Sequence, residues 1–250
     1  MTEDIKPFIK VFDKIAYTKS DTEVFNDFLD ISICALSAGG YEEEYLLIIK
    51  KYKKEEVNLF CELFAQMVIL MDADGHGLTD VLGEFYQTRM SSAKRGQYFT
   101  PETVSDFMAA IVNPEESEKT ILDPACGSGR MLLSAAKLNR NNYFFGADID
   151  HLCCKITTLN LCLNYMQGEI AWMDSLGGHE YHWGGYSITR LYGCVPVIRK
   201  LAAGEGIIAN SAPFNRKNKG EDATKSTAPV EEKKILPANN TIVIQTKLDL

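Results

Sequence analysis

The residues whose types and spacing suggest chemistry begin with the heptapeptide Asp123-Pro-Ala-Cys-Gly-Ser-Gly129. It follows a short apolar run and precedes a helical pattern, where α/β folds present backbone N–H groups to a ligand. Gly127 and Gly129 allow a ligand to approach the backbone closely. A dinucleotide fingerprint needs a third glycine at position 132, which is leucine. The pattern therefore disfavours a nicotinamide cofactor.

A carboxylate follows at a distance typical of nucleoside sites. Asp148 ends the next apolar segment and lies 19 residues after Gly129. At this spacing in α/β folds, an acidic side chain accepts hydrogen bonds from ribose hydroxyls. The sequence therefore predicts a nucleoside as the ligand.

The elements that must position these residues are predicted by alternating patterns. Short apolar runs at 120–122, 143–145 and 170–173 alternate with helical patterns at 131–138 and 152–166. This order predicts an α/β fold with a doubly wound, mostly parallel sheet. Residues 1–95 carry apolar positions three or four apart and predict an all-helical N-terminal lobe. We expect that lobe, then a ligand-binding core at 96–214, then a polar, disordered tail at 215–250.

Charge and composition exclude several classes of protein. The chain of 250 residues has 26 basic and 34 acidic residues, a net charge of −8, which is unfavourable for binding nucleic acid unaided. A role on DNA would need local basic patches or a basic partner. The sequence has neither an apolar membrane span nor a secretory signal, so we expect a cytoplasmic protein. The seven cysteines and four histidines show no metal-ligand spacing, so we predict no metal site.

Four segments, in this order, resemble class I S-adenosylmethionine-dependent methyltransferases, specifically the N6-adenine DNA methylases related to type I restriction modification subunits. Asp80-Val-Leu-Gly-Glu-Phe-Tyr86 resembles the helix before the family's cofactor loop, and Gly96-Gln-Tyr-Phe-Thr-Pro101 resembles its GQFFTP loop. Asp123 to Gly129 resembles its DPACGSG motif, and Asp174 resembles the acidic residue after its third strand. The resemblance covers roughly residues 80 to 176 and implies a class I methyltransferase core that binds S-adenosylmethionine.

The resemblance also implies a role for each part of the cofactor site. The Thr100 hydroxyl and the turn amides would bind the cofactor's carboxylate, and Asp123 would accept from its ammonium group. Asp148 would bind the ribose, and Asp174 the adenine amine. Ile149, Met173 or Phe99 would sandwich the adenine ring. The whole predicted set is Tyr98, Phe99, Thr100, Pro101, Asp123, Pro124, Ala125, Gly127, Gly129, Asp148, Ile149, Met173 and Asp174. Helix capping is an alternative role for Thr100 and Asp174.

The family's catalytic Asn-Pro-Pro-aromatic tetrapeptide does not occur in this sequence. The nearest string is Asn210-Ser-Ala-Pro-Phe214, after an expected strand at 206–209. Its extra residue shifts Phe214 by about 3.3 Å relative to Asn210 if the chain is extended. Asn210 and Phe214 are thus degenerate catalytic candidates, with a linker as the alternative. Few residues follow Phe214, so we expect a core that is truncated relative to its relatives.

Two functional hypotheses follow. The first is a methyltransferase acting on the N6 amine of adenine in DNA. The alternative is a catalytically silent or partner-dependent S-adenosylmethionine-binding module that acts with a DNA-specificity partner, such as a specificity subunit. Separately, Gln245, Leu248 and Leu250 resemble the peptides by which bacterial DNA-processing proteins dock on the sliding clamp. A strand through residues 241–246 is the alternative there.

Overall fold

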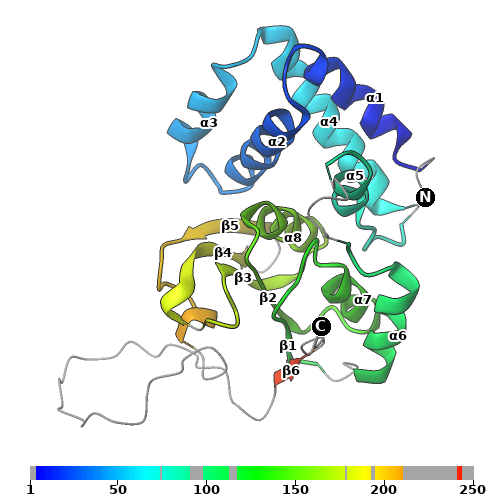
Figure 1. The fold of residues 1–250 in the computed structure, drawn as a ribbon, viewed down its shortest axis with the longest axis vertical. Coiled ribbons are helices and arrows are strands. Elements are labelled where there is room, and N and C mark those ends of the chain that lie inside the picture. The colour runs from blue at the N-terminus through cyan, green and yellow to red at the C-terminus, as the bar shows by residue number, and fades with distance from the viewer. Residues whose placement is uncertain are drawn as a thin grey trace, which may run out of the picture.

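Helices form the N-terminal part of the chain, and a mixed sheet with further helices packed on it forms the rest (Figure 1). The computed structural model describes residues 4–73, 75–90, 98–112, 117–177, 179–192, 195–210 and 241–243. The N-terminal helices are α1 (Lys6–Ile15), α2 (Asp21–Ala35), α3 (Glu42–Ile49), α4 (Lys54–Asp72) and α5 (Val81–Arg89), with a 3-10 turn, η1 (Ala16–Thr18), after α1. None of the described helices is long and apolar enough to cross a membrane.

An aromatic cluster holds the N-terminal helices together. The ring of Phe85, on α5, lies with its centroid 4.6 to 5.0 Å from those of Phe8, Phe12 and Phe25. All four side chains are fully buried. Because buried aromatic pairs stabilise a fold beyond their apolar area, α5 belongs to the helical lobe by packing as well as by sequence.

The core contains the predicted alternation of strands and helices. Its helices are α6 (Glu102–Val112), α7 (Arg130–Leu138) and α8 (His151–Leu163). Its strands are β1 (Thr120–Asp123), β2 (Tyr143–Asp148), β3 (Gln167–Met173), β4 (His182–Leu191), β5 (Val195–Leu201) and β6 (Thr241–Val243). Two further 3-10 turns are η2 (His179–Tyr181) and η3 (Ile208–Asn210).

The sheet has six strands in the order β5-β4-β3-β2-β1-β6. Strands β6, β1, β2 and β3 run parallel, whereas β4 and β5 form an antiparallel extension beside β3. The predicted α/β fold with a mostly parallel sheet behind a helical lobe is confirmed. The strand expected at 206–209 is wrong, because Ile208–Asn210 form a 3-10 turn. Of the predicted tail at 215–250, the structure describes only the three residues of β6.

The two faces of the sheet carry different partners. Alternate residues of a strand point to opposite faces. One face packs on the helices in the main hydrophobic core and includes Ile121, Phe144 and Ile170. The other face carries a smaller cluster with Ile208 of η3, formed by Leu122, Phe145, Ala147, Ala171 and Met173. Among the described residues, every α-helix contributes to the first cluster and none to the second.

The helical lobe covers the edge strand β5. The backbone N–H of Ile198 donates to the carbonyl oxygen of Leu36, at 2.9 Å, where α2 ends. The backbone N–H of Lys200 donates to the Tyr41 hydroxyl at 2.7 Å. Edge strands expose unsatisfied donors that invite pairing with other chains, so these contacts both protect β5 and attach the lobe to the core.

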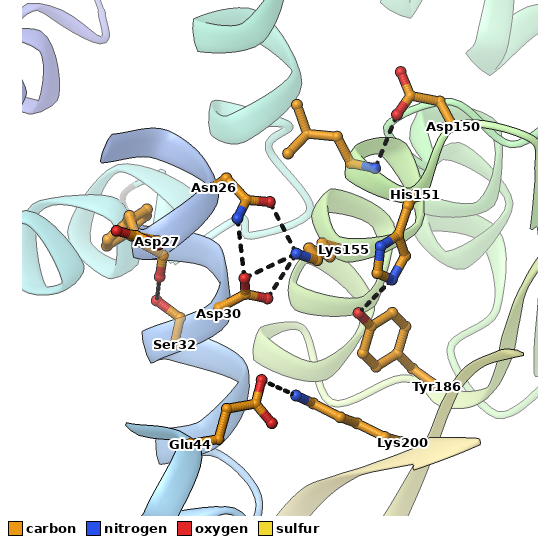
Figure 2. A network of polar contacts seen from close by, with 12 residues as sticks. Asn26, Asp27, Asp30, Ser32, Glu44, Asp150, His151, Lys155, Tyr186 and Lys200 are labelled. Atoms are coloured by element: carbon orange, nitrogen blue, oxygen red, sulfur yellow. Dashed lines mark hydrogen bonds and ion pairs between the residues drawn. The ribbon is translucent and has the colours of Figure 1, made fainter. Parts of the chain in front are cut away.

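A second attachment joins α2 to α8 (Figure 2). The Lys155 ammonium group lies 2.7 Å from a carboxylate oxygen of Asp30 and donates to Asn26 Oδ1 at 2.9 Å. On the same helix as Lys155, His151 bonds to the Tyr186 hydroxyl at 2.9 Å. The lobe therefore packs against the helical side of the sheet through both apolar and ionic contacts.

Candidate functional site

The loop between β1 and α7 has the backbone geometry that its glycines predict. Gly127 (φ 54°) and Gly129 (φ 84°) both lie in the left-handed region. A Cβ atom at Gly129 would lie 2.8 Å from Thr157 Cγ2 on α8, too close for any side chain. The sequence therefore needs glycine there for two reasons: the backbone conformation and the close approach of α8.

The carboxylate that ends β2 is bonded to this loop. Asp148 Oδ2 accepts from the backbone N–H of Gly127 at 2.8 Å, and Asp148 Oδ1 accepts from the backbone N–H of Asp150 at 2.8 Å. These bonds fix the carboxylate at the carboxyl ends of two neighbouring parallel strands. In open α/β sheets, ligands bind at this edge.

A cavity of about 150 Å³ opens at this edge. Six of the predicted residues line it, namely Tyr98, Phe99, Thr100, Ala125, Gly127 and Asp148. Five residues that the sequence did not predict also line it, namely Cys126, Ser128, Arg130, Met131 and Cys153. The tertiary structure therefore brings the segment before α6, the glycine loop and the end of β2 to one place.

Phe99 forms an apolar wall above the glycine loop. Its ring stacks on that of Tyr86, on α5, with centroids 5.5 Å apart and planes at 24°. A Cβ atom at Gly127 would lie 2.9 Å from Phe99 Cδ1. Glycine at this position lets the aromatic ring lie directly against the loop backbone.

Several predicted residues lie outside the cavity. The Asp123 side chain is fully buried behind the loop, where Oδ1 accepts from the Ala125 N–H at 3.1 Å. Met173 is fully buried in the smaller cluster on the opposite face of the sheet, so its side chain does not meet Phe99. Asp174 Oδ1 accepts from the Leu176 N–H at 2.9 Å, a local turn contact. Ile149 is 63% exposed after β2.

The remaining three predicted residues, Gly129, Pro124 and Pro101, lie next to residues that line the cavity. Gly129 is the residue immediately before α7. The Pro124 carbonyl oxygen accepts from the Ser175 hydroxyl at 2.7 Å, which ties the loop to the turn after β3. Pro101 is exposed at the start of α6. These positions shape or flank the cavity edge without lining it.

Burial raises the pKa values of two carboxyl groups at this edge of the sheet, those of Asp123 and Asp148. Burial raises the pKa of Asp123 to about 7, and the nearby Asp148 adds to the rise. Burial also raises the pKa of Asp148, while the N–H donors of Asp150 and Gly127 oppose that rise. Two carboxylates that are costly to ionise side by side favour a cationic group nearby. Of the two, only Asp148 lines the cavity, so it is the carboxylate that a hydrogen-bond donor or a cation in the cavity would meet.

The catalytic candidates do not join this cavity in the described part of the chain. Asn210 lies in η3, where its side-chain amide donates to the Gly206 carbonyl oxygen at 2.7 Å, and it is not among the lining residues. Phe214 lies outside the described residues, as do Gln245, Leu248 and Leu250 of the predicted clamp peptide. Their roles stay predictions.

Among the lining residues that sequence reasoning missed, Arg130 had a detectable signal. It is a basic residue in the first turn of a helix, where the helix dipole disfavours positive charge. Such a residue suggests a specific anionic partner. Cys126, Met131 and Cys153 carried no such signal, because apolar residues in these elements fit a buried core equally well.

The sheet, the glycine loop and the acidic strand end define the class: an α/β protein with a cavity at the carboxyl ends of its parallel strands, where open α/β sheets bind ligands. The family described as N-6 DNA Methylase matches residues 78–243, about two thirds of the chain. The chain belongs to the N-6 DNA methylase family, as the sequence resemblance predicted.

Individual relatives are similar over shorter stretches. The type I restriction enzyme MjaVIII methylase subunit of Methanocaldococcus jannaschii is 34% identical over 93 residues, which are 34% of this chain and 16% of that protein. The MjaIX methylase subunit of the same organism is 28% identical over 113 residues, 40% of this chain and 20% of that protein. The matched regions therefore cover at most a fifth of the full length of either relative.

Solved structures show a more distant likeness. A class I S-adenosylmethionine-dependent methyltransferase of Listeria monocytogenes, itself described as putative, aligns with a TM-score of 0.40 at 16% identity, over 68% of this chain and 53% of that one. A type I restriction-modification methyltransferase subunit of Streptococcus thermophilus aligns with a TM-score of 0.34 at 18% identity, over 64% of this chain and 36% of that one.

Proposed function

We propose that this chain binds S-adenosylmethionine in the cavity beside Asp148 and transfers its methyl group to the N6 amine of adenine in DNA. The observation that carries the proposal is the hydrogen bond between Asp148, at the end of β2, and Gly127, in the loop after β1. It joins the Asp148 carboxylate to the glycine loop on one cavity, an arrangement typical of nucleoside sites in α/β folds. Membership of the N-6 DNA methylase family and relatives named type I methylase subunits support the same function.

The residues around the cavity suit the chemical groups of this cofactor. Asp148 has oxygen lone pairs left after its backbone bonds and suits a ribose diol. Thr100 would bind the carboxylate. An ammonium group bound at the loop would favour the ionised form of Asp123, whose pKa burial raises to about 7. Phe99 and Ile149 would contact the adenine ring and Asp174 its amine. When bound, S-adenosylmethionine supplies an electrophilic methyl group, so the chain's own residues need only bind and orient the reactants.

Calorimetry with S-adenosylhomocysteine tests the site without requiring catalysis. Wild-type protein should bind, and Asp148→Ala should lose about 1.5 to 3 kcal/mol of binding free energy, the range for hydrogen bonds to charged groups. Asp106→Ala is a matched control, because this carboxylate lies on α6 and bonds to Lys137 away from the cavity. The absence of binding by wild-type protein would refute the proposal.

The methyl acceptor needs a separate measurement. DNA incubated with the protein and labelled cofactor should yield N6-methyladenine on nucleoside analysis. We expect slow transfer by the isolated chain, since Asn210 does not line the cavity. Transfer that is robust and unaffected by Asn210→Ala would contradict both the slow rate and a catalytic role for Asn210.

The second candidate function is a cofactor-binding module that depends on a DNA-specificity partner. The net charge of −8 favours it, because DNA binding draws on basic surface that a partner would have to provide. A cognate specificity subunit, added to the transfer assay, should then raise both DNA binding and methylation. Strong, salt-sensitive DNA binding by the isolated chain would argue against this candidate.

A further inference from the structure

A buried polar cluster lies directly beneath the cavity. Its centre is Asp80, the residue before α5, which is 8% exposed. The Asp80 carboxylate accepts from the Gly83 N–H, the Ser128 hydroxyl, the Asn160 amide and the Arg130 guanidinium group. One carboxylate of the helical lobe therefore contacts the glycine loop, α7 and α8 at once.

Arg130 connects this cluster to the cavity wall. The guanidinium group bonds to Asp80 through Nε at 3.0 Å and lies 2.9 Å from it through Nη2. Its third nitrogen, Nη1, donates to the backbone carbonyl oxygen of Thr100 at 3.1 Å. Arg130 is itself 8% exposed and lines the cavity.

This position is unfavourable for a cation unless its partners compensate. The first turn of α7 carries the positive end of the helix dipole, and burial removes the water that would solvate the charge. Asp80 compensates the charge, and the planar fork of the guanidinium group reaches a carboxylate and a carbonyl oxygen together. A lysine ammonium group in the same place is a point donor on a flexible stem.

Within the described part of the chain, the segment that Arg130 contacts has one further side-chain hydrogen bond. Among the described residues, the other side-chain hydrogen bond to residues 98–100 runs from Gln87 Nε2 to the Phe99 carbonyl oxygen, at 3.4 Å. That length is beyond the usual range for a hydrogen bond of this kind. Stacking on Tyr86 holds the Phe99 ring, but it does not fix the Thr100 backbone.

We propose that Arg130 is a positioning residue for the cofactor site. Held by Asp80, it keeps the Thr100 backbone, and with it Phe99, against the glycine loop, so that the cavity has its wall before a ligand arrives. We call the contacts from Asp80 to Arg130 and from Arg130 to the Thr100 carbonyl oxygen the Arg130 clamp. Because Asp80 precedes α5, this clamp also makes the helical lobe part of the site's support. The inference rests on the proposed function, since it assigns Arg130 to the same cofactor cavity.

The chain offers a matched control for the test. Lys155 is also a buried cation on a core helix that pairs with a carboxylate of the lobe, Asp30, at 2.7 Å. Lys155 does not line the cavity. We expect both Arg130→Met and Lys155→Met to lower stability, and only Arg130→Met to disturb the site. Arg130→Lys, which keeps the charge without the fork, should fall between Arg130→Met and the wild type.

Two readouts at a temperature where all variants are folded separate positioning from stability. Amide hydrogen exchange in residues 98–112 should be faster in Arg130→Met, with no local change in Lys155→Met. The dissociation constant for S-adenosylhomocysteine should rise about tenfold or more in Arg130→Met and less than about threefold in Lys155→Met. If Arg130→Met does not fold, Arg130→Lys against Lys155→Met gives the same comparison with smaller changes.

The outcomes distinguish this inference from the proposed function. Equal affinities and equal exchange in the two methionine variants would overturn the role of Arg130 and leave cofactor binding intact. Failure of the wild type to bind S-adenosylhomocysteine would refute the proposed function. In that case, faster local exchange in Arg130→Met would still support the clamp on residues 98–100, and unchanged exchange would overturn it.

Discussion

Two largely buried ionic junctions attach the helical lobe to the core, and they differ in burial and in the number of donors that share each carboxylate. The cavity junction comprises Asp80, Ser128, Arg130 and Asn160, and the sheet junction comprises Asn26, Asp30 and Lys155. The Asp80 and Arg130 side chains are 6% and 10% exposed. Asp30 is 16% exposed and bonds only to Asn26 and Lys155 in the contacts described.

This difference separates attachment from site formation. Removing a carboxylate that several buried donors share takes an acceptor from each of them, whereas a partly exposed carboxylate can be replaced by water. The cavity junction also contacts the glycine loop and the segment at 98–100, which line the cavity, and the sheet junction does not. We therefore expect lobe attachment and ligand binding to be coupled at the first junction and independent at the second.

The largest expected effect tests the first junction directly. Asp80→Ala leaves the Arg130 guanidinium group buried without its carboxylate and should cost about 3 to 5 kcal/mol of unfolding free energy. Asp30→Ala should cost about 1.5 to 3 kcal/mol, because Asp30 is more exposed than Asp80 and water can take its place beside Lys155. Urea denaturation measures both. Equal losses would mean that the two junctions do not differ as their burial suggests.

A smaller effect is expected on how the unfolding free energy depends on pH, through His151, which lies on the same helix as Lys155 of the sheet junction. The His151 ring stacks on Trp172 with centroids 4.3 Å apart, and burial, with help from Lys155, lowers its pKa to about 4. Because an unfolded histidine titrates near pH 6.5, the stability that the neutral ring contributes is present above about pH 6.5 and is lost as pH falls through about 4. His151→Phe should therefore flatten this part of the pH dependence of unfolding.

Tyr186→Phe is the control for that experiment. It removes the hydrogen bond to His151 but keeps the histidine and most of its burial. The pH dependence between about 6.5 and 4 should persist in this variant, since burial is the main cause of the lowered pKa. A flat profile in Tyr186→Phe, or an unchanged one in His151→Phe, would assign the acid response to another group.

The smallest effect is expected at the edge strand. The Glu44 and Lys200 side chains form an ion pair while 44% and 26% exposed, respectively. Such pairs contribute about 0 to 1 kcal/mol, and salt screens them. Glu44→Ala should change the unfolding free energy by no more than this in dilute buffer and by less in 1 M salt. A loss that salt does not reduce would show that Glu44 stabilises the lobe by something other than its ion pair with Lys200.

The sequence predicts those parts of the site that depend on local pattern. Strand β1, the glycine loop, α7 and the end of β2 follow one another with recognisable periods and turn residues, so the positions of Gly127 and Asp148 along the chain imply their meeting. The antiparallel strands β4 and β5 were not predicted, because the chain before and within β4 is rich in glycine, which disfavours strand in propensity. The 3-10 turn at Ile208–Asn210 was mistaken for a strand because a short apolar run fits both.

Sequence alone determined the order of elements from β1 to β3, the family motifs and the need for glycine in the loop, because backbone conformation and apolar periodicity are set by neighbouring residues. The tertiary structure decided which side chains meet. It turned Met173 to the face opposite the helices, buried Asp80 beneath the cavity and brought Arg130 to the Thr100 carbonyl oxygen. Those outcomes depend on strand pairing and on contacts between buried residues that lie 30 to 80 positions apart along the chain. No local sequence pattern encodes such contacts.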